Sequence, residues 1–278
     1  MSLLEALQAV VLGIVEGLTE FLPISSTGHL IIASKWIGFD GYAGVNTFLV
    51  AIQAGAIFAV CWYYRTLIWN ILRNLFTSGE EQRLAINTII AFVPAVAVGL
   101  CFADFIQTHF FNIGTVVVML ILGGIVLLWI ERRASRPDYR PRVKEMKDLT
   151  YAQAFGVGVA QCFAMIPGTS RSGSTIIGGL LLGLSRKAAT EFSFFLAIPT
   201  ILGASVYDLW KSRETLLQSD LSVEIFLIGL VVSFVSALAV VKWLIGFVSR
   251  HDYRPFGWYR IIFGLLLLAG WFAGIVTF

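Results

Sequence analysis

The stretch "EGLTEFLPISSTGH", Glu16–His29, places polar and charged side chains in the middle of an otherwise apolar region. "LQAVVLGIV" precedes it and "LIIASKWIGF" follows it. Two carboxylates, a run of hydroxyls and an imidazole are costly to bury, because they give up hydrogen bonds to water. Pro23 and the Ser/Thr/Gly run that follows it interrupt a helix at this point. The stretch therefore predicts a broken helix whose turn carries functional groups.

The composition of the chain indicates a membrane protein. Of its 278 residues, 58% are hydrophobic and only 13% are charged, whereas a soluble domain carries about 25% charged residues. The net charge of +3 is too small to favour nucleic acid as a partner. Cys61, Cys101 and Cys162 form no C-x-x-C pair and are expected to be buried as small hydrophobic residues. The expected partner is the lipid bilayer.

Six apolar segments are long enough to cross a membrane, which takes about 20 residues. Two further regions, 3–38 and 152–185, are apolar but broken near Pro23 and Pro167, and their flanks are short for a full crossing. They are expected to form re-entrant helix–loop–helix hairpins, because broken backbone at membrane depth must be buried in protein or line a wet cavity. The six expected spans are 45–64, 84–103, 113–131, 190–207, 224–247 and 256–276.

The two broken regions resemble each other. "FLPISSTGHLII" and "MIPGTSRSGSTII" both run from apolar residues through Pro, hydroxyls and Gly to Ile-Ile. The pseudo-repeats 1–131 and 150–278 each contain one hairpin and three spans, and an odd number of spans inverts the second repeat. The predicted fold is an all-α integral membrane protein with a single membrane domain, 1–278, built as an inverted-topology repeat.

The charges of the connecting loops predict the orientation. Lys and Arg are abundant in the loops 65–83, 132–148 and 249–255. The loop 104–112 contains neither residue, and in 208–223 the acids outnumber the bases. The positive-inside rule makes the first three loops cytoplasmic and the last two external. The first hairpin then enters from outside and the second from the cytoplasm, so their tips are expected to meet inside the membrane.

The first tip combines acids, hydroxyls and a histidine. Glu16 and Glu20 are four residues apart and share one helix face, which favours either a divalent cation site or a pair that holds a proton. His29 can act as base, acid or phosphorus nucleophile near neutral pH. The hydroxyls of Ser25, Ser26 and Thr27 are typical of a helix N-cap, and such a helix end also binds anions.

The second tip provides a phosphate cradle. Arg171 is the single charged residue between Asp148 and Arg186, and a guanidinium binds phosphate rigidly and keeps its charge when buried. Combined with the acids and histidine of the first tip, this cradle favours phosphoryl transfer on a lipid-borne phosphate. No G-x-x-x-x-G-K-[ST] nucleotide loop is present. Further donors in the cradle are the hydroxyls or backbone N–H groups of Gly168, Thr169, Ser170, Ser172 and Ser174.

At these residues the chain resembles the bacterial undecaprenyl pyrophosphate phosphatases of the bacitracin-resistance type (the UppP/BacA family). The match rests on Glu16–His29, on "PGTSRSGST" (Pro167–Thr175) and on "EFSFFLAIPT" (Glu191–Thr200), and it covers nearly the whole chain. The resemblance implies a hydrolase of the bacterial inner membrane that acts on a phosphoric anhydride. Its substrate would be undecaprenyl (polyprenyl) diphosphate, cleaved to the monophosphate and phosphate. This reaction recycles the carrier lipid of peptidoglycan synthesis and confers bacitracin resistance.

The resemblance also implies which residues act. A divalent cation, Mg²⁺ or Ca²⁺, is expected at Glu16 and Glu20, and the active site is expected to open to the periplasm. Ser26, His29 and an activated water remain alternative nucleophiles. The expected catalytic residues are Glu16, Glu20, Ser26, His29 and Arg171, and the expected phosphate-binding residues are Thr27, Gly168, Thr169, Ser170, Arg171, Ser172 and Ser174.

A transporter is the alternative function. Broken helices and inverted repeats are also transporter features, so the chain could be a polyprenyl-phosphate flippase. A transporter has little use for a histidine beside two acids, and this cluster favours the enzyme. Gly123–Gly124 fits either close helix packing or a homodimer face, and the sequence does not choose between them.

Overall fold

The structure is a computed structural model that describes residues 2–77, 79–136, 138–211 and 221–274. In these ranges every regular element is a helix, and Val143 and Leu184 form the single isolated β-bridge. Six of the described helices are long and apolar enough to cross a membrane, as the sequence predicts, although the end of the last expected span, 256–276, lies outside the described residues. They are α3 (Val45–Tyr63), α5 (Glu80–Phe110), α6 (Ile113–Ala134), α9 (Arg186–Lys211), α11 (Val223–Val248) and α12 (Arg254–Phe272).

The two broken regions are helix–turn–helix elements. The breaks expected near Pro23 and Pro167 are confirmed, and the helices on either side contain 17, 11, 12 and 11 residues. All four are shorter than the roughly 20 residues that a full crossing takes. Their entry into the membrane as re-entrant hairpins stays a prediction. The helices are α1 (Leu3–Thr19), α2 (Ser26–Trp36), α7 (Tyr151–Cys162) and α8 (Arg171–Leu181).

Two expected loops are partly helical. Segment 65–83 contains α4 (Arg65–Arg73), because Leu67, Ile68 and Ile71 recur at helical spacing and form its less exposed face. Helix α5 begins at Glu80 and continues to Phe110 through most of the expected loop 104–112. Nothing in "DFIQTHF" breaks a helix, since it has neither Gly nor Pro.

The expectation that the cysteines are buried is wrong. Cys61 and Cys162 are half-buried and Cys101 is exposed, and all three are free thiols. A helix that faces lipid presents apolar side chains outward as well as inward. An apolar neighbourhood therefore does not imply burial inside this protein.

The described residues form two compact units, each assembled from segments of both predicted pseudo-repeats. The units therefore do not test the repeat, which stays a prediction. Helices α9 and α11 each contribute to both units. Unit 1 comprises the described residues of Met1–Phe21, Ser26–Tyr64 and Ala197–Leu244, and unit 2 those of Leu22–Ser25, Arg65–Leu196 and Ile245–Phe278.

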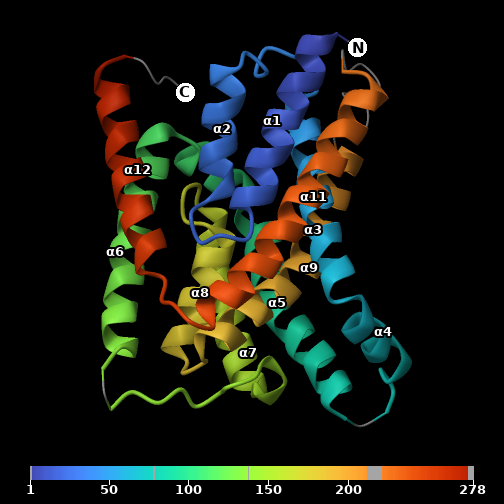
Figure 1. Cartoon of the computed structure of the whole chain (residues 1–278), viewed down its shortest axis with the longest axis vertical. Coiled ribbons are helices and arrows are strands. Elements are labelled where there is room, and N and C mark those ends of the chain that lie inside the picture. The colour runs from blue at the N-terminus through green and yellow to red at the C-terminus, as the bar shows by residue number, and fades with distance from the viewer. Residues whose placement is uncertain (1, 78, 137, 212–220, 275–278) are drawn as a thin grey trace. The chain divides into compact units, whose positions relative to one another are not determined.

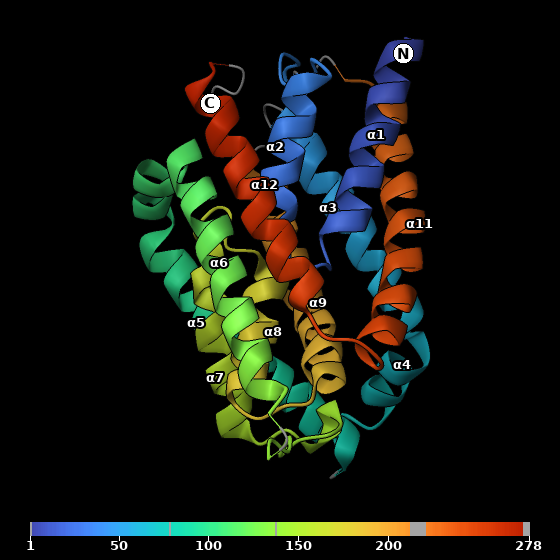
Figure 2. The ribbon, with the colours of Figure 1, turned by 60° about the vertical axis from the view of Figure 1, so that its left-hand side comes forward.

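Unit 1 is built on α1, α3 and α11, which run side by side in Figures 1 and 2. A Cβ atom on Gly17 of α1 would lie 2.6 Å from the carbonyl oxygen of Ser233 of α11. Gly55 of α3 lies so close to the backbone of Leu230 that no side chain fits. Small residues that allow such close approach are typical of helix packing in membranes. The apolar core beside them consists of Ala9, Leu12, Leu30, Phe39, Phe48, Ile52, Leu221 and Ile225.

Unit 2 contains a second glycine-mediated helix pair, α6 and α12 (Figures 1 and 2). A Cβ atom on Gly124 would lie 2.7 Å from the carbonyl oxygen of Gly257. Gly124 therefore serves helix packing within the chain, which was one of the two alternatives for Gly123–Gly124. A homodimer stays a prediction. Gly158 of α7 packs in the same way against the backbone of Ala91 of α5.

Candidate active site

Glu16 and Glu20 lie at the end of α1, inside unit 1. Their exposed fractions are 0% and 9%. Glu20 caps the helix, and its backbone N–H donates to the carbonyl oxygen of Glu16 at 2.9 Å. Gly13 and Gly17, which pack against α11, each precede one of the carboxylates by three residues and share its helix face. Close packing of α1 on α11 thus holds both carboxylates in the interior of unit 1.

A serine hydroxyl is bonded to one of these carboxylates. Ser26 begins α2, and its Oγ donates to Oε2 of Glu20 at 2.5 Å. Ser26 is itself buried, with 8% of its surface exposed. A hydroxyl bonded to a carboxylate is the arrangement of a nucleophile beside its general base. The sequence placed both residues in the site but did not predict that they form a pair.

The remaining residues of the first motif lie on the first turns of α2. His29 is half-buried and follows Ser26 by three residues, so the two lie on one face of the helix. Thr27, expected to bind phosphate, is exposed. Gly28 between them is buried. The helix therefore presents a hydroxyl and an imidazole together.

The turn of the first motif, Leu22–Ser25, belongs to unit 2. The Oγ atom of Ser172 donates to the carbonyl oxygen of Leu22 at 2.8 Å. Ser25 adopts a φ of 72°, in the left-handed region that a side chain disfavours. Strained backbone of this kind clusters at functional sites. Within unit 2, the second motif thus holds the backbone of the first turn.

The turn of the second motif precedes α8. Gly168 has a φ of 88°, and a Cβ atom there would lie 2.5 Å from the carbonyl oxygen of Val116, so only glycine fits. Ser170 has a φ of 75°, and its Oγ accepts a hydrogen bond from the backbone N–H of Gly173 at 3.1 Å. Ser170 thereby caps α8, and the N-terminus of a helix favours anions.

Arg171 is the first residue of α8. It is half-buried, and its Nη1 donates to the backbone carbonyl of Ser193 of α9 at 3.0 Å. The hydroxyl of Ser193 is in turn 2.7 Å from the hydroxyl of Thr175. Ser193 and Thr175 therefore orient the guanidinium. Sequence reasoning did not assign them this role, although both lie in stretches that carry the family resemblance.

Two hydroxyls of the second motif lack a hydrogen-bond partner among the described residues. They are Oγ of Ser174 and Oγ1 of Thr169, and both atoms are buried. Ser174 is 7% exposed and Ser172, which bonds to Leu22, is 0% exposed. Buried polar atoms nearly always have a partner. The two hydroxyls are thus available to bond phosphate oxygens.

Arg260 of α12 is a functional residue that sequence reasoning missed. It is 0% exposed, and it uses all five of its N–H groups on backbone carbonyls. Two of these acceptors lie in α6 and three in the motif turns. An isolated arginine in an apolar segment was the signal that identified Arg171, and it applies equally here. The acceptors, at 2.9–3.2 Å, are the carbonyl oxygens of Met119, Leu120, Pro23, Gly168 and Thr169.

The acids offer a limited set of metal ligands. Among the residues that the structure describes, no group of three or more His, Cys, Asp and Glu side chains is placed to hold a metal ion. Mg²⁺ is often held by one or two carboxylates together with water and substrate phosphates. Glu16 and Glu20 therefore fit a cation that also binds the substrate. Ca²⁺, with about six to eight oxygen ligands, would need more from water and substrate.

Comparison with known proteins identifies the family. The family model described as bacitracin resistance protein BacA matches residues 9–266. The chain belongs to this family. The family resemblance that the motifs predicted is thus confirmed over nearly the whole chain.

Individual members of the family are similar along their full length. A protein of Ralstonia pickettii named undecaprenyl-diphosphatase is 52% identical, over 97% of this chain and 96% of its own. A protein of Rhodospirillum rubrum named undecaprenyl-diphosphatase 2 is 51% identical, over 100% of this chain and 99% of its own. A third, an undecaprenyl-diphosphatase of Polaromonas sp., is 51% identical over 98% and 97%.

Proposed function

We propose that this chain is a membrane undecaprenyl-diphosphatase, which hydrolyses undecaprenyl diphosphate to undecaprenyl phosphate and phosphate. The hydrogen bond between Ser26 and Glu20 carries the proposal, because a hydroxyl beside a carboxylate base is suited to attack phosphorus. The relatives named undecaprenyl-diphosphatase support the same substrate. The six apolar helices suit a substrate that is anchored in lipid.

In the first step, Oγ of Ser26 attacks the terminal phosphorus and Glu20 takes the hydroxyl proton. The bond from this phosphorus to the bridging oxygen breaks, and the bridging oxygen leaves with undecaprenyl phosphate. Ser26 then carries the phosphoryl group. Arg171 and the hydroxyls of Thr169 and Ser174 bind the phosphate oxygens, where charge stabilisation contributes most to phosphoryl transfer.

In the second step, water attacks the phosphorus of phosphoserine. His29, on the same face of α2 as Ser26, takes a proton from the water. The bond between phosphorus and the serine oxygen breaks, and that oxygen recovers its proton from Glu20. Phosphate leaves, and His29 returns its proton to solvent.

A divalent cation held by Glu16 and Glu20 would neutralise charge on the phosphate oxygens. Thr27, Gly168, Ser170 and Ser172 complete the proposed phosphate site through hydroxyl or backbone N–H groups. The bond from Ser172 to Leu22 supports the joint action of both motifs, because Leu22 follows Glu20 by only two residues.

The proposal extends to the membrane setting. The two helix–turn–helix elements would enter the membrane from opposite sides, as re-entrant hairpins of an inverted repeat. The active site would open to the periplasm, where hydrolysis would recycle the lipid carrier of the cell wall and confer bacitracin resistance. The loop charges support this orientation.

Phosphate release tests the activity. The purified full chain in detergent would receive undecaprenyl diphosphate, with added Mg²⁺ or with chelator. Glu20→Gln, Ser26→Ala and Arg171→Ala should each lower the rate by about 10³-fold. The control is Ser34→Ala, which removes another buried serine of α2 whose hydroxyl bonds to the carbonyl of Ile31 at 3.0 Å. It should keep the wild-type rate.

Acid quenching with substrate labelled in its terminal phosphate tests the serine step. Label should stay on the wild-type protein as phosphoserine and be absent from Ser26→Ala. If Ser26→Ala kept full activity, the attack by serine would be ruled out and water would be the nucleophile. A folded wild type that releases no phosphate under either metal condition would overturn the enzyme and favour a polyprenyl-phosphate flippase.

A further inference from the structure

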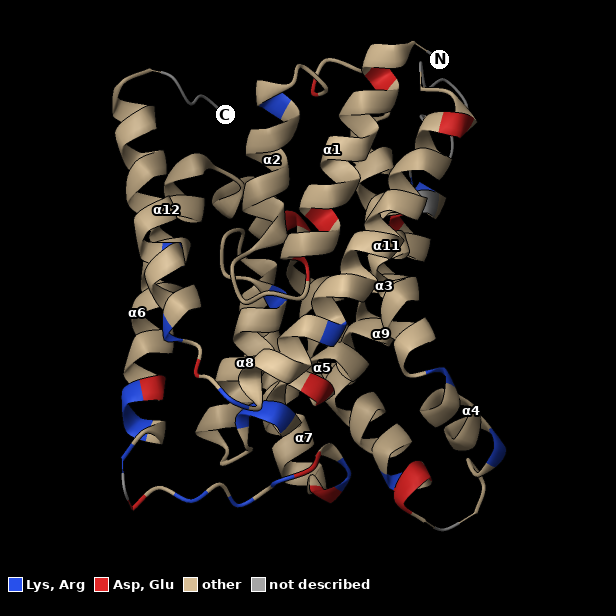
Figure 3. Cartoon of the chain, viewed as in Figure 1, with Lys and Arg blue, Asp and Glu red and all other residues tan. Residues whose placement is uncertain are grey.

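The segment after α6 is fixed to the start of α9 within unit 2. The backbone N–H groups of Arg142 and Val143 donate to the carbonyl oxygen of Gly183 at 2.8 and 3.1 Å. The N–H of Ser185 donates to the carbonyl oxygen of Val143 at 2.8 Å. Figure 3 shows Lys and Arg residues spaced along this segment. The chain thus holds a run of cations at one place instead of leaving them to move apart in solvent.

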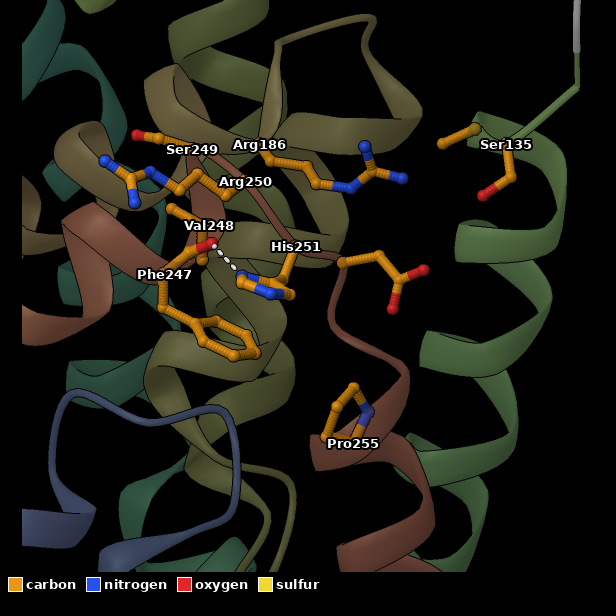
Figure 4. A pocket seen from close by; sticks show the side chains of 10 residues that line it. Ser135, Arg186, Phe247, Val248, Ser249, Arg250, His251 and Pro255 are labelled. Carbon is orange, nitrogen blue, oxygen red and sulfur yellow. Dashed lines mark hydrogen bonds between the residues drawn. The ribbon is translucent and has the colours of Figure 1, made fainter.

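A cavity of about 550 Å³ lies beside these backbone bonds, and Arg140, Lys144, Arg186 and Lys187 line it. We call it the basic pocket. Small-molecule sites commonly measure about 300–1,000 Å³. The basic pocket shares Arg186 with a neighbouring cavity of about 520 Å³. Figure 4 shows this neighbour, where the side chain of Arg186 reaches towards Ser135.

The lining of the basic pocket is positive and contains no Asp or Glu. Arg186 is paired with the fully buried Glu131, at 2.5 Å. Lys187 lies 3.9 Å from Glu191, the limit of an ion pair. Lys144 has no carboxylate partner among the described residues. Like charges held around one cavity repel each other, and a bound anion relieves that repulsion.

The start of helix α9 lies at the same place. Ser185 lines the basic pocket and caps α9, with its Oγ accepting from the N–H of Ala188 at 3.1 Å. The N-terminus of this long helix adds partial positive charge. Tyr139 and Ser249 also line the pocket, and their hydroxyls donate to the carbonyl oxygens of Leu180 and Ile245. The cations of the lining and the N-terminus of α9 match the oxygens of a phosphate ester.

The basic pocket also lies where three candidate spans end. Ala134 is the last residue of α6, Arg186 the first of α9 and Val248 the last of α11, and all three line the pocket. Leu180 and Leu184 add apolar surface. A ligand here would have its charged group among the cations and its apolar part beside the helix ends. Basic pockets between membrane helices bind anionic lipid headgroups by this arrangement.

We propose that the basic pocket binds the headgroup of an anionic glycerophospholipid, on the membrane side that the loop charges predict to be cytoplasmic. The lipid bridges the segment after α6 and the start of α9, and stabilises unit 2 there. It is distinct from the substrate, because none of the lining residues belongs to either motif.

Lipid titration of the purified full chain tests the proposal. Phosphatidylglycerol should raise the unfolding temperature to a plateau and appear as a bound lipid in native mass spectra, whereas phosphatidylcholine should do neither. Arg140→Gln/Lys144→Gln should weaken phosphatidylglycerol binding about 30-fold, at the contribution usual for two basic residues near a membrane. Higher salt should weaken it further.

The control Arg65→Gln/Arg73→Gln removes the same charge from α4, on the same predicted membrane side, and should bind like the wild type. If the two double variants weakened phosphatidylglycerol binding equally, the basic pocket would not be the binding site. An unfolding temperature that rose equally with phosphatidylcholine would also overturn the proposal. Glycerol 3-phosphate that binds as tightly as the lipid would overturn the lipid assignment. Phosphate release by Arg140→Gln/Lys144→Gln in detergent should stay at the wild-type rate, which separates this test from that of the enzyme.

Discussion

The turns of the first and second motifs share one backbone feature and differ in the chemistry that follows it. Ser25 and Ser170 have φ values of 72° and 75°, and they are the two residues other than glycine with positive φ in the described ranges. Each directly precedes a helix, α2 or α8. The next residue in the first turn is Ser26, bonded to a carboxylate, and in the second it is Arg171, bonded to a carbonyl.

This difference separates geometry from function. A left-handed residue before a helix turns the chain sharply, whatever side chains come next. A serine in this conformation costs about 1–2 kcal/mol that glycine avoids. Helix α2 then begins with Ser26, whose hydroxyl is bonded to Glu20 at the end of α1, whereas α8 begins with Arg171. The repeat itself stays a prediction.

Removing Arg260 should break both turns at once and have the largest effect. Arg260→Met leaves the turn carbonyls of Pro23, Gly168 and Thr169 without their guanidinium donor, each at a cost of about 1–3 kcal/mol. We expect a lower unfolding temperature and a loss of phosphate release of at least about 100-fold, seen in kcat more than in KM. Thermal unfolding and steady-state kinetics measure both.

Arg254→Met is the matched control, since Arg254 is a half-exposed arginine of the same helix. It should change neither quantity appreciably. If Arg260→Met had the same unfolding temperature and the same rate of phosphate release as Arg254→Met, Arg260 would not be a positioning residue for the turns.

Gly168→Ala should break the second turn alone. The new methyl group would lie 2.5 Å from the carbonyl oxygen of Val116, in addition to the left-handed strain. We expect a loss of activity larger than the loss of stability, because the turn positions Arg171. Gly38→Ala controls for the strain, since Gly38 has a φ of 70° and nothing lies within 4 Å of its Cβ position. Similar stability of the two variants would show that the contact with Val116 is not tight.

Replacing the left-handed serines should have the smallest effect. At Ser25 and Ser170, the glycine variant should be more stable than the alanine variant, because alanine keeps the left-handed strain. Ser2 is the control, an N-cap with an ordinary φ of −87°. At Ser2 the free energy of unfolding of the glycine variant should exceed that of the alanine variant only by about 1 kcal/mol, the usual capping difference. An equal glycine–alanine difference at all three positions would contradict the strain at the turns.

The sequence predicted the spans because apolar runs of sufficient length are a direct signal. It also predicted the breaks at Pro23 and Pro167, where Gly, Ser and Thr follow the proline. Pro94 and Pro199 lie inside α5 and α9 without ending them, since neighbouring groups can satisfy the freed carbonyl in a membrane helix. Proline alone therefore does not locate a break, and its neighbours do.

The site was predictable in its residue types but not in its pairings. Burial cost identified Glu16, Glu20 and Arg171 as functional candidates, since charge in an apolar segment needs a reason. The bond from Ser26 to Glu20 depends on the backbone angles of the turn between them, which spacing does not fix. Arg260 carries the same signal as Arg171, but its place at the turns was not predictable, because its five acceptors are backbone carbonyls that leave no trace in the sequence.

The position of Arg260 has a consequence for biosynthesis. The first motif leaves the ribosome early, whereas α12 is among the last helices to be made. Until α12 arrives, the carbonyls of Pro23, Gly168 and Thr169 lack the guanidinium that joins them. A truncated chain would therefore insert its early helices without assembling both turns. A chain that ends before α12 is therefore expected to be inactive.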